Sequence, residues 1–167
     1  MKIATKLAAV LFCSSLTGCA APITYYSKEP NASKPSMVHF FSQGGTYSTI
    51  ALYEDAKTCK GIQRVAFFEP GVDKTVYIPA GQYLTFSAYV QFPGFPGFKY
   101  GSSMYTVPLG TGNFRVGISY NATNMFTKIE RQGAGGDWVV VKDAVKRNPH
   151  QPLFESGDWC ESSSEIQ

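Results

Sequence analysis

Few residues in this chain of 167 have the type and spacing that catalysis requires. The sequence contains no Gly-x-Ser-x-Gly nucleophile motif, no pair of closely spaced zinc-binding histidines and no glycine-rich phosphate loop before a helix. Its two histidines lie far apart, His39 in an apolar run and His150 beside a proline, which argues against a metal site. We therefore expect no catalytic residue, no metal and no cofactor.

Four acidic residues beside predicted turns are the remaining candidates for acid–base chemistry: Glu54, Asp55, Glu69 and Asp73. Two carboxylates that meet across a substrate act as the acid and base of a glycosidase. Carboxylates in solvated loops are far commoner than such pairs. The sequence therefore favours a protein that is not an enzyme, and an envelope enzyme or enzyme inhibitor is the least favoured alternative.

The N-terminus has the layout of a secretory signal. Lys2 and Lys6 supply the positive charge that precedes a short apolar run from Leu7 to Leu16. This run is much shorter than the about 20 apolar residues that a helix needs to cross a bilayer. The ending Leu16-Thr17-Gly18-Cys19 resembles the lipobox of bacterial lipoproteins. This resemblance implies cleavage before Cys19 and acylation of its sulfur and amine by fatty acids that include palmitate. In such lipoproteins an Asp after the acylated cysteine favours the inner membrane, so Ala20 implies the outer membrane, facing the periplasm.

The signal also simplifies the cysteines. Of the four in the chain, Cys13 lies in the discarded segment and Cys19 receives the lipid, which leaves Cys59 and Cys160. An even pair in an oxidising compartment predicts a disulfide. Closing a loop of roughly 100 residues would stabilise the fold by at most about 4.7 kcal/mol. Two separate buried thiols are the alternative.

The charge balance excludes one class of partner. Removal of the signal takes two lysines, so 13 of the 15 basic residues remain against 12 acidic ones. A mature chain so close to neutrality lacks the concentrated basic patch that nucleic-acid binding needs. We expect a membrane contact through the lipid and an envelope protein or glycan as partner, but no nucleic acid.

A duplicated Phe-Pro-Gly unit runs from Phe92 to Tyr100. Proline fixes φ and glycine permits positive φ, so this segment predicts a protruding loop. Exposed aromatic rings on a loop commonly mark a contact surface for protein, sugar or lipid. The candidate contact residues are Phe92, Phe95, Phe98 and Tyr100. Alternatively, the rings fold back and cap the open end of the domain.

Alternation with a period of two marks the clearest strands. Over residues 82–92 the apolar side chains occupy every second position and predict a core face, whereas Tyr83 and Tyr89 fall on the outer face. These two tyrosines could form an aromatic platform for a glycan or a peptide strand, although tyrosine is ordinary on an outer sheet face. Residues 113–120 repeat the alternation. Weaker strands are predicted at 37–42, 47–53, 64–68, 75–78, 104–107, 125–130 and 138–141.

The closely spaced short strands, separated by glycine, proline and asparagine turns, predict an all-β fold. We expect an antiparallel β-sandwich, Ig-like or transthyretin-like, of about seven to nine short strands, with a small β-barrel as the alternative. A single helical turn is predicted near residues 143–147.

The expected organisation is a signal peptide over residues 1–18, a lipidated cysteine and flexible tether over 19–36, one β-sandwich domain over 37–161 and a polar tail over 162–167. An alternative for the tether is that residues 23–26 pack as a first edge strand. These features favour a lipid-anchored, non-catalytic binding or assembly module. A structural accessory subunit of a larger envelope or secretion complex is the second possibility.

Overall fold

The computed structural model describes residues 25–26, 35–94, 96–153, 157–161 and 166. Within them the chain forms ten β-strands and no helix. The strands are β1 (Pro35–Ser42), β2 (Tyr47–Asp55), β3 (Lys60–Pro70), β4 (Asp73–Pro79), β5 (Tyr83–Pro93), β6 (Phe98–Pro108), β7 (Asn113–Tyr120), β8 (Met125–Gln132), β9 (Trp138–Val140) and β10 (Val145–Lys146).

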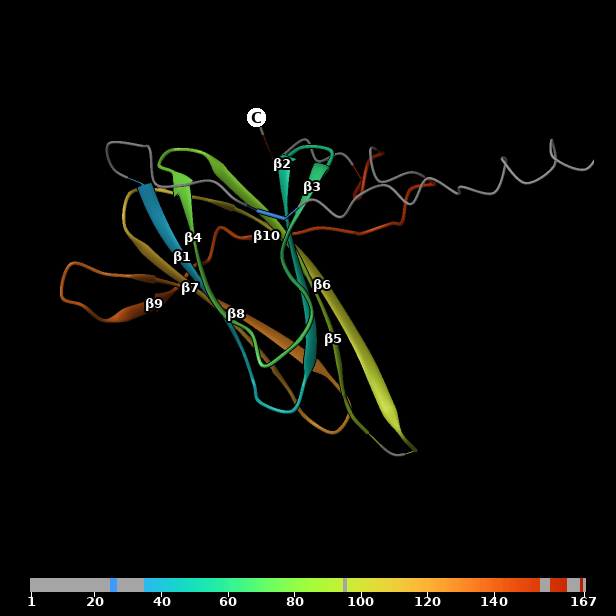
Figure 1. The fold of residues 1–167 in the computed structure, drawn as a ribbon. Helices are drawn as coiled ribbons and strands as arrows, with labels where there is room; N and C mark the ends of the chain where they lie inside the picture. Colours follow the sequence, from blue (N-terminus) through green and yellow to red (C-terminus); the bar gives the residue numbers. More distant parts are fainter. Residues whose placement is uncertain (1–24, 27–34, 95, 154–156, 162–165, 167) are drawn as a thin grey trace, which may run out of the picture.

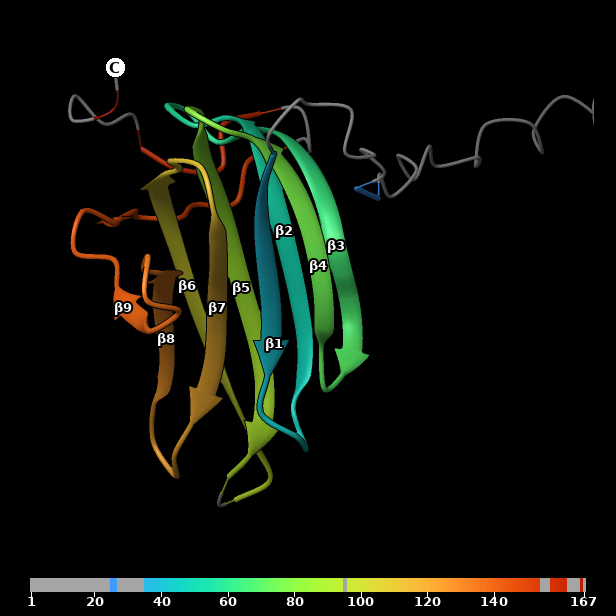
Figure 2. The same cartoon turned by 90° about the vertical axis from the view of Figure 1, so that its left-hand side faces the viewer.

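The strands form two separate five-stranded sheets that stack face to face (Figures 1 and 2). Sheet I has the order β10-β6-β5-β2-β3, and sheet II has the order β4-β1-β7-β8-β9. The expected β-sandwich is therefore confirmed in preference to the alternative. All neighbouring strands are antiparallel except β1 and β7, which run parallel.

The core lies between the sheets and follows the alternation in the sequence. On β5 the five apolar side chains that alternate along the strand are all at most 3% exposed: Leu84, Phe86, Ala88, Val90 and Phe92. Burying side chains of this size stabilises a fold by about 1.5–3 kcal/mol for each Val, Leu or Phe. Because successive side chains of a strand point to opposite faces, the intervening residues of β5 lie on the outer face of sheet I.

The structure differs from the sequence predictions at the end of the domain. The helical turn expected near residues 143–147 is wrong, because Val145–Lys146 pairs with β6 as the short strand β10. The backbone N–H of Arg147 then donates to the carbonyl of Met104, 2.9 Å away, which extends this pairing by one residue. Residues 145–146 form a strand because they pair with the open edge of β6. A local sequence pattern cannot predict a partner that is so distant in the sequence.

Two described residues N-terminal to β1, Tyr25 and Tyr26, also pair with a sheet edge. Tyr25 forms a parallel bridge with Arg64 of β3, and the N–H of Tyr26 donates to the Arg64 carbonyl at 2.9 Å. The hydroxyl of Tyr26 donates to the carbonyl of Tyr77 on β4, so this tyrosine touches the edges of both sheets. Tyr25 and Tyr26 thus behave as the edge-strand alternative predicts, while residues 23 and 24 lie outside the described part of the chain.

Candidate functional site

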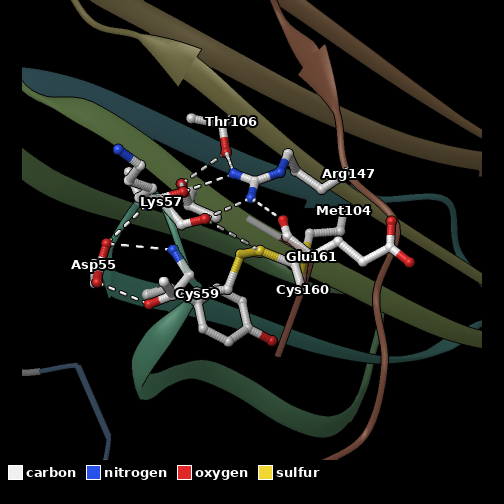
Figure 3. The surroundings of a disulfide bond; sticks show 12 residues. Asp55, Lys57, Cys59, Met104, Thr106, Arg147, Cys160 and Glu161 are labelled. Carbon is white, nitrogen blue, oxygen red and sulfur yellow. Dashed lines mark hydrogen bonds between the residues drawn. A yellow bond between two sulfur atoms is a disulfide. The ribbon is translucent and has the colours of Figure 1, made fainter. Parts of the chain in front are cut away.

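A disulfide fastens the C-terminal residues to the outer face of sheet I. The sulfur atoms of Cys59 and Cys160 are 2.01 Å apart and the Cα atoms are 5.5 Å apart, so the pairing expected from the cysteine count is present (Figure 3). Both cysteines are at most 1% exposed. Cys59 lies in the loop between β2 and β3, and Cys160 belongs to the segment after β10. We name that segment, residues 147–153 and 157–161, the strap.

Arg147 holds the same loop and the strap together by hydrogen bonds. Its guanidinium donates to the carbonyls of Ala56 and Lys57 in the loop, at 2.6 and 2.7 Å, and to the carbonyl of Glu161 in the strap, at 2.5 Å (Figure 3). A fourth hydrogen bond, 3.0 Å long, reaches the Thr106 hydroxyl on β6. Arg147 is 3% exposed, and this burial lowers the pKa of its guanidinium. Hydrogen bonds from a charged donor are stronger than neutral ones, so the cluster is a second fastening beside the disulfide.

A groove of about 340 Å³ lies between the strap and the outer face of sheet I. Its position follows from side-chain size. Ala51 of β2 stands opposite Ser87 of β5, and these two small side chains leave space among larger neighbours. The larger residues come from all four long strands of the sheet and from the strap. They include Tyr53, Arg64, Phe67, Tyr89, Met104, His150 and Trp159.

Aromatic rings form much of the groove lining. The ring centroids of Tyr53 and Trp159 are 6.3 Å apart, and the Arg64 guanidinium lies 5.4 Å from the centroid of Phe67. The hydroxyl of Tyr53 hydrogen-bonds the Ser87 hydroxyl at 3.0 Å. Burial is the main cause that raises the pKa of Tyr53, so this phenol stays neutral and able to donate at physiological pH.

Several polar groups of the groove remain available to a ligand. Within the described part of the chain, the side chains of Tyr89, Ser102, His150 and Gln151 form no hydrogen bond to another residue. Of the lining residues that the structure describes, Arg64 is the only one with a permanent charge, and none is a carboxylate. The groove therefore offers hydroxyl, imidazole and amide groups around apolar and aromatic surfaces.

Beside the groove, the outer face of sheet I carries a group of exposed aromatic side chains. We name this group the aromatic face: Tyr47, Phe67, Phe68, Tyr89, Phe98 and Tyr100, each between 41% and 62% exposed. The rings of Tyr47 and Phe68 stack with centroids 4.9 Å apart, and those of Tyr89 and Tyr100 stack at 5.9 Å. The aromatic face extends along the β5–β6 hairpin, whose tip reaches beyond the other strands at the bottom of Figures 1 and 2.

An irregularity in β3 brings two consecutive phenylalanines to the surface. The register between β2 and β3 shifts near Ile50, and Phe68 has a left-handed φ of 51°. The N–H of Phe68 donates to the Thr49 hydroxyl at 3.1 Å instead of continuing the ladder. Such bulges redirect side chains, and here Phe67 and Phe68 are both exposed, by 44% and 50%.

The residues of the predicted contact loop are exposed only in part. Phe92 is wrong as a contact residue, because it is 1% exposed and stacks on Tyr120 inside the sandwich, with ring centroids 4.9 Å apart. Phe98 and Tyr100 are exposed by 58% and 62%, and Phe95 lies outside the described residues. The chain turns tightly where the Gly94 N–H donates to the Gly97 carbonyl at 2.8 Å, so β5 and β6 continue almost to the turn.

The two outer tyrosines of β5 do not form one platform. Both are exposed, Tyr83 by 38% and Tyr89 by 41%, but Tyr83 begins the strand whereas Tyr89 lies near its middle. Tyr89 borders the groove and stacks on Tyr100, whereas Tyr83 borders a smaller pocket next to Tyr26. Only Tyr89 belongs to the candidate site.

The four acidic candidates are each engaged elsewhere. Asp55 accepts hydrogen bonds from Thr58, and Glu54 accepts one from Gln63. Glu69 pairs with Lys74 and Asp73 pairs with His39, at 2.6 Å in both cases. Each of the four therefore has a partner of its own among the described residues. The described residues also contain no group of three or more His, Cys, Asp or Glu placed to hold a metal ion.

Sequence reasoning missed Arg64, Phe67, His150 and Trp159. The first two reach the groove through the irregular strand β3, and the last two through the strap. A signal did exist for Trp159, because it precedes Cys160 and a disulfide must carry its neighbours to the loop of Cys59.

The lipidation site Cys19 lies outside the described residues. Among the residues that are described, none belongs to a helix with the length and apolar character to span a bilayer. Comparison with known proteins gives no match to any family model, curated protein or solved structure.

Proposed function

We propose that this protein is a lipid-anchored component of a bacterial envelope that acts as a non-catalytic binding module. The observation that carries the proposal is the aromatic face, six exposed rings gathered on one side of one sheet. The groove adjoins it through Tyr89, which belongs to both. Together they make a continuous contact surface on sheet I.

Physical considerations support a contact role for this surface. Clustered exposed aromatic side chains promote association with other molecules, and large apolar patches of this kind mark interaction sites. Tyrosine and phenylalanine supply a large contact area and lose little conformational freedom on binding. A rigid sheet presents the rings, so a partner meets a surface that is already organised.

The lipobox resemblance supplies the location in this proposal. Acylation at Cys19 would anchor the protein in the outer membrane with the sandwich in the periplasm. More than one acyl chain gives stable attachment. A substitution Cys19→Ala is expected to abolish lipidation and move the protein from the detergent phase to the aqueous phase after phase separation. Unchanged partitioning of that variant contradicts the anchor.

The contact surface is tested by the double substitution Phe98→Ala and Tyr100→Ala. Both side chains are more than half exposed, so the variant is expected to keep its melting temperature. Capture of envelope material after reversible crosslinking in intact cells should fall by about tenfold, because exposed aromatic anchors contribute strongly to interfaces. Protein and carbohydrate in the captured material are measured separately.

A matched control removes two exposed apolar side chains from the other sheet, through Phe126→Ala and Val139→Ala, which are 50% and 57% exposed. This control is expected to capture as much material as the unaltered protein. Equal losses in both double variants, or no loss in either, would contradict the proposed surface.

A further inference from the structure

The groove has a composition that selects among ligands. It combines apolar rings with hydroxyl, imidazole and amide groups that form no hydrogen bond within the described chain, namely those of Tyr89, Ser102, His150 and Gln151. An acyl chain would leave these polar groups without partners, at a cost in desolvation. A purely apolar ligand therefore fits poorly.

The position of the groove also disfavours an added peptide strand. Strand addition uses the free backbone groups of a sheet edge. The groove lies instead over the middle of sheet I, where β2 and β5 pair continuously from Tyr47 to Tyr53 and from Thr85 to Gln91. Only side chains face the ligand there.

A sugar ring has the complementary chemistry. One face of a pyranose consists of C–H groups that pack on aromatic rings, and its rim carries hydroxyls that both donate and accept hydrogen bonds. The groove supplies aromatic surfaces in Tyr53, Tyr89 and Trp159 and polar groups of both kinds in Ser102 and Gln151. Its volume of about 340 Å³ is within the range of about 300–1,000 Å³ seen for small-molecule sites.

The charge of the lining is compatible with neutral and acidic saccharides. Among the described residues that line the groove, Arg64 carries the only permanent charge, and none of them is a carboxylate that would repel an acidic sugar. The groove also meets the aromatic face at Tyr89, where further rings continue along β6 to Tyr100. A chain of several sugars could therefore extend from the groove over that face.

From these contacts we infer that the groove binds a unit of a linear saccharide and that Tyr89 stacks on it. The inference rests on the proposed binding function and specifies its ligand class. Tyr89 is a binding residue in this assignment, whereas Tyr83, which begins the same strand on the same face, is not.

The test uses the full-length protein in detergent and a tetrasaccharide of N-acetylglucosamine as the probe. The chain has two tryptophans, so Trp138→Phe leaves Trp159 in the groove as the fluorescent reporter. Titration should change the Trp159 emission and reach saturation. The acidic tetrasaccharide with alternating glucuronic acid serves as a second probe.

The variants Tyr89→Ala and Tyr83→Ala form a matched pair, since the two side chains are 41% and 38% exposed on one face of β5. Tyr89→Ala should weaken binding by about tenfold, because loss of one aromatic stacking contact changes the binding free energy by about 1.4 kcal/mol. Tyr83→Ala should leave it unchanged. Ser102→Leu, at an exposed position, should block the groove and gives an independent readout if Tyr89→Ala fails to fold.

Saccharide binding that is unaffected by both Tyr89→Ala and Ser102→Leu would overturn the groove assignment. No binding of either tetrasaccharide at millimolar concentration would overturn the saccharide inference. If capture of envelope material still depends on Phe98 and Tyr100 in that case, the proposed contact function stands with a different ligand. If the protein binds neither tetrasaccharide and its capture of envelope material does not depend on Phe98 and Tyr100, both the saccharide inference and the proposed contact function are wrong.

Discussion

At the scale of single residues, Arg147 shows how hydrogen bonds to backbone carbonyls satisfy a buried charge. Its guanidinium donates to three carbonyls and one hydroxyl that belong to the β2–β3 loop, the strap and β6. The partners lie in three segments that are remote in sequence. One side chain therefore connects them, and no apolar residue of similar size can replace it without leaving buried acceptors unsatisfied.

Substitution Arg147→Met is expected to lower the free energy of unfolding by about 3 kcal/mol, because each buried acceptor that loses its partner costs about 1–3 kcal/mol. Urea unfolding under oxidising conditions measures this change. The free energy of unfolding of Arg147→Lys should fall between those of the unaltered protein and Arg147→Met, since lysine keeps the charge but its compact ammonium cannot span the acceptors that the planar guanidinium fork reaches. An Arg147→Met protein with an unchanged urea midpoint would show that the carbonyls find other partners.

Glu130 gives the fold a dependence on acid pH. Its carboxylate is in a residue only 5% exposed and accepts hydrogen bonds from Arg115 at 2.7 Å and Lys128 at 2.8 Å. The hydrogen bond from Arg115 is the main cause that holds the Glu130 pKa below its ordinary value, followed by that from Lys128. The stabilisation that the charged Glu130 contributes to the fold is therefore complete above the pKa of a glutamate in the unfolded chain, about 4.3. It is lost as the pH falls through the lower pKa that Glu130 has in the folded protein.

Glu130→Gln should accordingly reduce stability at neutral pH and flatten the loss of stability below about pH 4. Melting temperatures measured from neutral to acid pH test this expectation. Some acid dependence should remain, because hydrogen bonds from Thr58 also lower the pKa of Asp55. If the melting temperature of the variant falls as steeply with acid pH as that of the unaltered protein, groups other than Glu130 cause the acid dependence.

At the scale of elements, the regular strands could be predicted and the irregular ones could not. The alternation in β5 and β7 places their core residues correctly, because one buried face imposes a period of two. The same alternation already puts Phe92 on the core face, and the Phe-Pro-Gly pattern wrongly suggested a contact role for it. A turn as short as Gly94 to Gly97 leaves the preceding residue inside the strand.

The candidate site depends mainly on what local patterns do not encode. Phe67 and Phe68 are both exposed because β3 slips its register against β2, and a period of two cannot predict a slip. His150 and Trp159 reach the groove through a strap held by distant contacts. The exposed side chains of the regular hairpin, Phe98 and Tyr100, could be predicted from the sequence.

At the scale of elements, we predict how much the disulfide and Arg147 each stabilise the attachment of the strap. Replacing both Cys59 and Cys160 by alanine should lower the free energy of unfolding by up to about 4.7 kcal/mol, the entropy estimate for a loop of this length. The hydrogen bonds of Arg147 should still hold the strap in part. Combining this variant with Arg147→Met in a double-mutant cycle should therefore reveal coupling, because both devices fasten the same segment. Strictly additive urea results would show that they act independently.

At the scale of the whole molecule, the pairing of Tyr25 would limit how far the domain stands from a membrane under the proposed anchoring at Cys19. Tyr25 lies six positions after Cys19, a distance of at most about 20 Å in an extended chain. The bridge to Arg64 is parallel, so the chain enters from the end of β3 that begins at Lys60. The β5–β6 hairpin is at the opposite end of the sandwich (Figure 1).

In a lipid-anchored protein this arrangement turns the hairpin away from the bilayer. A fluorescent amino acid at Lys57, in the loop before β3, should be quenched more strongly by spin-labelled headgroups than one at Tyr100. Replacing Tyr26 by Phe removes its hydrogen bond to the Tyr77 carbonyl and should reduce this difference. Stronger quenching at Tyr100 would reverse the orientation and place the aromatic rings at the lipid surface.

Under the proposed function, the strap also makes ligand binding depend on the C-terminal end of the chain. One side of the groove comes from Trp159, beside a cysteine whose partner is 101 residues earlier in the chain. A chain that lacks its last residues lacks this wall of the groove. Under the proposed function, the groove is complete only after the C-terminal residues have been exported and packed on the sheet, where the disulfide then holds them.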